Sequence, residues 1–155
     1  MHLESLARSL KEHPFVAGMS EAEVAFLAGC TKNARFDPGQ YLFHEGAEAD
    51  TLFLLRSGRV ALESHAPGRG TAMLETLGSS DVIGWSTLFE PYRWDLDGRA
   101  IEATLAFAVD GRCLRGKLDG DAAFGYALTR RLLFHVHRRL EQARFQQLDV
   151  YRAAP

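Results

Sequence analysis

The sequence predicts a mainly β protein with helices: a double-stranded β-helix, also called a jelly roll or β-roll, between N-terminal helices and a long C-terminal helix. Two observations support this fold class. From about residue 35 to residue 110, short runs of β-forming residues alternate with glycine-rich turns, which is typical of a sandwich or closed roll. On both sides of that region, apolar residues recur at helical spacing. Strands and long helices do not alternate, so a parallel α/β sheet is excluded.

Length and composition fit a single domain. The 155 residues leave room for one, with N-terminal helices over 1–34, the roll over 35–110 and C-terminal helices over 111–155. Hydrophobic residues make up 46% and charged residues 25%, which excludes a disordered or collagen-like chain. The net charge of −2 argues against a dedicated nucleic-acid binder, for which a basic surface is expected.

The first region predicts helices over residues 3–30. Leu3, Leu6 and Leu10 fall at helical spacing, and Pro14 ends that run. Ser20 and Glu23 then have the spacing of a capping box, placed directly before a second apolar run.

The middle region predicts many short strands. Runs of β-forming residues occupy 41–43, 52–55, 60–62 and 73–77, and residues 100–109 add one or two more. Turn residues such as those at 37–39 and 67–70 separate them.

The last region predicts one long helix, from Ala122 to about Tyr151, since it contains no proline and a glycine only near its start. At 1.5 Å per residue its length is roughly 45 Å, more than a small β domain needs for cover. One stripe, Phe124, Leu128 and Leu132, can face the β domain. A second stripe has the 3-4-3-4-3 spacing of a coiled-coil seam and predicts a parallel homodimer interface: Leu133, Val136, Leu140, Ala143, Gln147 and Val150. The alternative is a helix packed wholly on its own core.

Residues 42–58 carry the most informative motif. Gly46 and Gly58 mark tight turns, and the four apolar residues 52–55 predict a strand buried on both faces. Together these residues resemble the first signature of the cyclic-nucleotide-binding domain, as found in the catabolite activator and anaerobic regulator family of bacteria. Phe43 departs from that signature, where a smaller aliphatic residue is usual. N-terminal helices, an eight-stranded roll and a dimer-forming helix, in that order, are the regulatory half of that family.

The resemblance implies a phosphate-binding segment after residue 83. The family has a Gly-Glu pair, a small and an aliphatic residue, and then an arginine followed by a small residue. The corresponding ligand-binding residues are Gly84, Trp85, Ser86, Thr87, Leu88, Arg99 and Ala100. Arginine suits a phosphate because its planar guanidinium donates two parallel hydrogen bonds. Arg93 is the alternative to Arg99 as the phosphate-binding arginine. Trp85 replaces the glutamate that holds the ribose hydroxyl in the family, and indole accepts no hydrogen bond.

The resemblance further implies a sensor module related to bacterial transcription regulators. It would bind a small anionic effector, with cAMP or cGMP as candidates, and signal through its dimer helix. The alternative is a degenerate domain that binds no nucleotide and acts by protein interaction. The chain ends without the helix-turn-helix domain of a complete regulator, so no direct DNA binding is expected. Since no signal-peptide pattern or membrane-length apolar run is present, we expect a cytoplasmic protein without a membrane segment.

No catalytic or metal-binding set is predicted. The histidines lack ligand spacing, and His135 and His137 point to different faces of a helix. No Ser-His-Asp or Cys-His set is recognisable, so an enzyme is not expected. Cys30 and Cys113 lie far apart and neither belongs to a CxxC pair, which favours two reduced thiols. The arginine-rich C-terminal segment, with six arginines and three acidic residues over 121–155, is interpreted as the solvated face of a dimer helix.

Overall fold

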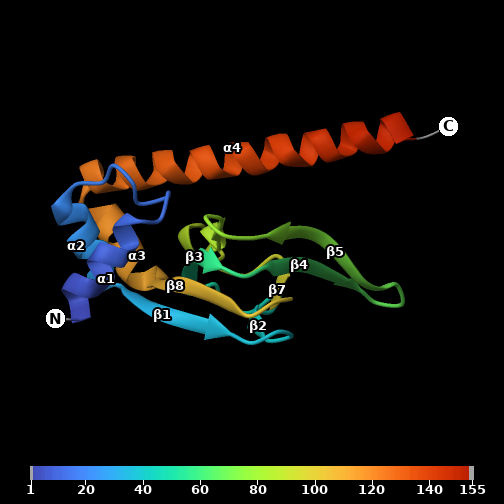
Figure 1. The fold of residues 1–155 in the computed structure, drawn as a ribbon, viewed down its shortest axis with the longest axis horizontal. Coiled ribbons are helices and arrows are strands. Elements are labelled where there is room, and N and C mark those ends of the chain that lie inside the picture. The colour runs from blue at the N-terminus through green and yellow to red at the C-terminus, as the bar shows by residue number, and fades with distance from the viewer. Residues whose placement is uncertain (1, 154–155) are drawn as a thin grey trace.

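A computed structural model describes residues 2–153 (Figure 1). Two helices, α1 (His2–Lys11) and α2 (Glu21–Gly29), precede the strands, and α3 (Gly111–Gly120) and α4 (Ala122–Ala153) follow them. The strands are β1 (Thr31–Phe36), β2 (Tyr41–Phe43), β3 (Thr51–Ser57), β4 (Val60–Ala66), β5 (Gly70–Leu77), β6 (Val82–Ile83), β7 (Asp97–Ala100) and β8 (Thr104–Asp110). A short 3₁₀ helix, η1 (Trp85–Leu88), follows β6.

The strands form two antiparallel sheets that face each other as a roll. One sheet has the order β1-β8-β3-β6 and the other β2-β7-β4-β5. The predicted eight-stranded jelly roll with flanking helices is therefore confirmed.

Strand β3 separates two hydrophobic cores. Leu52 and Leu54 belong to the core shared with the helices, whereas Phe53 and Leu55 belong to the core inside the roll. Because successive side chains of a strand point to opposite faces, an unbroken apolar run is what this position requires. The predicted two-faced burial of residues 52–55 is confirmed.

The roll begins earlier than expected. The roll begins at Thr31 rather than near residue 35, because β1 pairs along its whole length with β8. The predicted capping box is confirmed: Ser20 Oγ accepts the Glu23 N–H, and Glu23 accepts the Ser20 N–H.

Helix α4 packs against the core only with its first half. Phe124, Leu128 and Leu132 are buried in the core shared with the N-terminal helices and β8, as their spacing predicted. Beyond them α4 continues along the roll, and its C-terminal end lies at the side opposite to α1 and α2 (Figure 1).

The two cysteines are joined by a disulfide. Cys30, directly after α2, is bonded to Cys113 in α3, with a sequence separation of 83 residues and a Cα–Cα distance of 6.0 Å. The prediction of two reduced thiols is therefore wrong for this structure. The fold brings the end of α2 beside the start of α3, a proximity that sequence spacing does not reveal.

Candidate functional site

The turn after β6 is built around Gly84. Its φ of 109° lies in the left-handed region, and a Cβ would stand 2.7 Å from the Thr51 carbonyl oxygen and 3.0 Å from the Trp94 ring. Only glycine meets both requirements. The chain then enters η1, which carries Trp85 and Ser86 toward α4 and places Thr87 in the interior.

A pocket of about 170 Å³ lies beneath this turn. Its walls come from four parts of the chain: the roll interior, the Gly84–Ser86 turn, the segment 94–96 and, from α4, Arg139. The predicted residues Gly84, Trp85 and Ser86 all line it. The long helix α4 and the Gly84–Ser86 turn therefore line the same pocket.

Two aromatic rings fill the inner end of this pocket. Phe43 stacks on Trp94 with ring centroids 3.8 Å apart and planes at 11°, and both side chains are buried. Gly98 makes the space for Phe43, since a Cβ there would lie 2.5 Å from Cζ of that ring. The unusual Phe43 thus has a structural partner, and together the two rings restrict the size of any ligand.

At the outer end of the pocket, Arg139 joins α4 to the roll. Its Nε and Nη2 donate to the two carboxylate oxygens of Glu75 on β5, at 2.9 and 2.6 Å. Its guanidinium lies over the Trp85 ring, 4.3 Å from the centroid. The Arg139 side chain is 12% exposed and that of Glu75 is 31% exposed.

The remaining turn residues face the helical side. Thr87 is fully buried, and its Oγ1 has no hydrogen-bond partner in the described part of the chain. The Thr87 carbonyl accepts a hydrogen bond from Arg115 of α3. Leu88 packs on the core shared with the helices. These two residues fasten the turn to α3 and do not line the pocket under Gly84.

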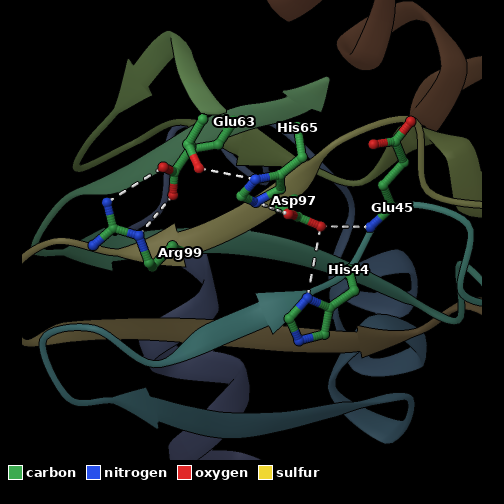
Figure 2. Close-up of polar contacts among 7 residues, drawn as sticks. His44, Glu45, Glu63, His65, Asp97 and Arg99 are labelled. Atoms are coloured by element: carbon green, nitrogen blue, oxygen red, sulfur yellow. Dashed lines mark hydrogen bonds and ion pairs between the residues drawn. The ribbon is translucent and has the colours of Figure 1, made fainter. Parts of the chain in front are cut away.

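The structure does not bring Arg99 to this pocket. Ala100 pairs with Val60 and is buried, whereas Arg99 pairs with Ala61 and points to the outer face of the sheet. There its Nε donates to Glu63 at 2.6 Å (Figure 2). The hydrogen bond and charge of Glu63 raise the pKa of Arg99. Arg93, the alternative, is exposed, and its Nη1 lies 3.5 Å from the Gly46 carbonyl oxygen.

The same outer face carries a second polar group around Asp97 (Figure 2). This buried carboxylate accepts the Glu45 backbone N–H at 2.7 Å and pairs with His65 Nε2 at 2.7 Å and His44 Nδ1 at 3.6 Å. Within residues 2–153 no three histidine, cysteine or carboxylate side chains are placed to hold a metal ion. The group ties the segment that follows β2 to β4 and β7.

The predicted seam on α4 is uncovered in the single chain. Leu133 is 68% exposed, Leu140 is 47% exposed, and Val136, Ala143 and Gln147 are also exposed. The Val150 side chain lies outside the described ones. Beside the start of the seam, an apolar groove of about 770 Å³ runs between η1 and α4, and Trp85 lines both this groove and the pocket.

Sequence reasoning missed Glu75 and Arg139. A signal was present for the arginine: Arg139 follows Leu132 by seven residues, so it continues the stripe that faces the protein's own core. A charged residue on an inward face requires a partner of opposite charge. Nothing in the sequence identified Glu75, 64 residues away, as that partner.

Comparison with known proteins agrees with this architecture. The model of the cyclic nucleotide-binding domain family matches residues 34–121. The CRP-like cAMP-activated global transcriptional regulator of Mycobacterium tuberculosis is 28% identical over 98 residues, which are 63% of this chain and 44% of that protein. The chain therefore corresponds to less than half of this curated relative.

Two solved structures are similar over most of their length. The N-terminal domain of a transcriptional regulator from Streptomyces coelicolor is 28% identical, with a TM-score of 0.65 over 89% of this chain and 94% of that one. A putative cyclic nucleotide-binding protein from Geobacter metallireducens, 24% identical, shares the fold with a TM-score of 0.79 over 86% of this chain and 97% of that one. No helix within residues 2–153 is long and apolar enough to cross a membrane. With more than half of its length matched by the family model, the chain belongs to the cyclic nucleotide-binding domain family.

Proposed function

We propose that this protein is a regulatory module that binds a small anionic effector and responds through α4. One observation carries the proposal: Arg139 of α4 forms a wall of the pocket under the Gly84 turn. A ligand in that pocket touches the turn and the long helix together. It can therefore favour one position of α4 over another, which is the differential contact that a ligand-driven switch requires.

The response passes to a second copy through the seam of α4. The exposed residues Leu133, Val136 and Leu140 would be covered in a parallel homodimer, and the apolar groove continues from them to η1. Trp85, which lines both the groove and the pocket, connects the ligand site to this interface. We propose that occupation of the pocket changes how the two α4 helices pack.

The role is regulatory and not catalytic in this proposal, because the family is a binding domain and the pocket contains no nucleophile paired with a base. Relatives include transcriptional regulators. We propose that this chain acts on its pathway through a protein partner.

A second candidate function is supported by the aromatic stack. Phe43 and Trp94 occupy the inner end of the pocket, and the remaining 170 Å³ is below the roughly 300–1,000 Å³ of typical ligand pockets. A domain whose pocket is filled in this way would bind no nucleotide and would act only by associating with another protein through the α4 seam.

Thermal unfolding of purified, ligand-free protein distinguishes the two functions. The panel contains cAMP, cGMP, cyclic dinucleotides and inorganic phosphate, with linear 5′-AMP as a control. A ligand at 100 times its dissociation constant stabilises the native state by about 2.7 kcal/mol, which raises the midpoint by several degrees. A selective rise supports the effector function. An unchanged midpoint across the panel contradicts it and favours the association module.

A further inference from the structure

Residues 2–153 contain two bidentate Glu–Arg pairs in different surroundings. Glu63 and Arg99 lie on the outer face of the roll, on neighbouring strands of one sheet. Glu75 and Arg139 lie at the mouth of the pocket and join β5 to α4. Only the second pair stands where a ligand could compete with one of its members.

Arg139 is held in place by more than its carboxylate partner. Its guanidinium rests on the Trp85 ring at 4.3 Å, and its Nη1 donates to the Val82 carbonyl at 3.4 Å. Neither of these two contacts involves Glu75. The Arg139 guanidinium is thus held in a fixed orientation. A planar guanidinium can donate two parallel hydrogen bonds to a phosphate as well as to a carboxylate.

Glu75 is the more exposed partner. Its side chain is 31% exposed and lies on a strand whose other residues are mostly exposed, so its carboxylate can turn into water when displaced. The buried Glu63, 5% exposed, has no such freedom. Release of Glu75 also breaks the ion pair that ties α4 to β5.

We propose that Arg139 is the anion-binding residue of this pocket and that Glu75 is its built-in competitor. A phosphate-bearing effector replaces the Glu75 carboxylate on the guanidinium, and α4 exchanges a contact with β5 for a contact with the ligand. The inference rests on the proposed effector function and specifies its anion position and its regulation. It assigns the phosphate to an arginine of the long helix, 40 residues after the Arg99 that the sequence motif suggested.

Four charge-removing variants test this assignment: Glu75→Gln, Arg139→Gln, Arg99→Gln and, as the matched control, Glu63→Gln. Circular dichroism and unfolding midpoints establish that each is folded. Isothermal titration calorimetry then gives dissociation constants for cAMP, cGMP and inorganic phosphate. Without the Glu75 carboxylate, a larger fraction of the molecules has a free Arg139 guanidinium. Glu75→Gln is therefore expected to bind at least tenfold more tightly than the native chain. Arg139→Gln is expected to lose at least tenfold, and Glu63→Gln to stay within twofold.

The outcomes separate this inference from the effector function itself. Binding by Glu75→Gln where the native protein binds weakly or not at all supports the competitor role. Equal affinity in the native protein and Glu75→Gln overturns the inference and leaves the effector function standing. Loss of binding in Arg99→Gln but not in Arg139→Gln overturns the assignment of the arginine. Absence of binding to every variant and every anion overturns both the inference and the effector function.

Discussion

Phe43 stacks on Trp94, with the ring centroids 3.8 Å apart, at the place where the roll interior meets the Gly84 turn. Neither ring belongs to the turn itself, yet together they set how deep a ligand can enter. The size of the pocket is therefore decided by β2 and by the segment between η1 and β7, and not by the residues that would touch an anion.

Replacing Phe43 by leucine is expected to enlarge the pocket. The smaller side chain leaves the Trp94 ring without its stacking partner, and the free energy of unfolding should fall by about 1–2 kcal/mol. Urea unfolding measures this loss, and calorimetry with cAMP should show tighter binding than in the native chain. Phe36→Leu is the matched control, because Phe36 packs on Phe53 inside the roll without lining the pocket. A cyclic nucleotide affinity that does not change in Phe43→Leu would show that the stack does not limit the ligand.

His13 makes stability depend on pH. Its Nδ1 accepts the Phe15 N–H at 3.1 Å, so the proton of the neutral ring is on Nε2, which donates to the Leu55 carbonyl at 2.9 Å. Burial is the main cause that lowers the pKa of His13 below its ordinary 6.5. Between the lowered value and 6.5 the unfolded chain binds a proton that the folded chain does not. Stability should therefore be constant above pH 6.5 and fall as the pH drops through that window.

Urea midpoints between pH 5 and pH 7.5 measure this slope. Burial also lowers the pKa of His135, which adds a contribution of the same sign. His13→Gln should flatten the slope, because the buried imidazole is no longer present. An identical slope in His13→Gln and the native chain would refute the role of His13.

The proposed dimer seam predicts which substitutions on α4 would separate two copies of the chain. Leu140→Glu places a carboxylate at a central seam position and, in a symmetric dimer, opposite its own copy. The dissociation constant of the dimer should rise at least tenfold, as measured by sedimentation equilibrium. Leu148→Glu is the control, since Leu148 is 49% exposed and lies off the seam. A dimer that survives Leu140→Glu but not Leu148→Glu would place the interface on another face of the helix.

Reduction of the disulfide should lower stability by a large amount. The Cys30–Cys113 bond closes a loop of 83 residues that contains the whole roll. In the chain-entropy model, a loop of this length stabilises the native state by about 4.5 kcal/mol. Urea unfolding with and without dithiothreitol measures the difference, and Cys30→Ser/Cys113→Ser should resemble the reduced protein under both conditions. The same midpoint with and without reductant would mean that the thiols are not joined in solution.

The sequence predicted those parts of the fold that depend on residues close together in the chain. The apolar run 52–55, the Ser20–Glu23 capping box and the Phe124–Leu128–Leu132 stripe each satisfy a requirement of their own element. Each of these patterns lies within a short window of sequence, so it can be recognised without knowledge of the tertiary structure.

The parts that could not be predicted depend on contacts between distant residues. Strand β1 is largely polar and exposed, so its sequence does not show the apolar pattern of a strand. It forms a strand because its backbone pairs with β8. The Cys30–Cys113 bond and the Glu75–Arg139 pair join residues 83 and 64 positions apart. Arg99 was assigned to the ligand by motif position, but the alternation of β7 turns it to the outer face.

Asp121 is the only residue between α3 and α4, and its backbone is extended rather than helical. The disulfide fastens α3 to α2 on one side of this break, while on the other side Asp121 accepts the Phe124 N–H and starts a new helix. Any rotation of α4 as a whole relative to α3 would therefore be centred near Asp121. At 1.5 Å per residue, Arg139 lies about 27 Å along α4 and Ala153 about 48 Å. A shift of about 1 Å where Arg139 meets the pocket would become about 1.8 Å at the far end of the helix, so the length of α4 converts a small exchange of partners into a larger movement.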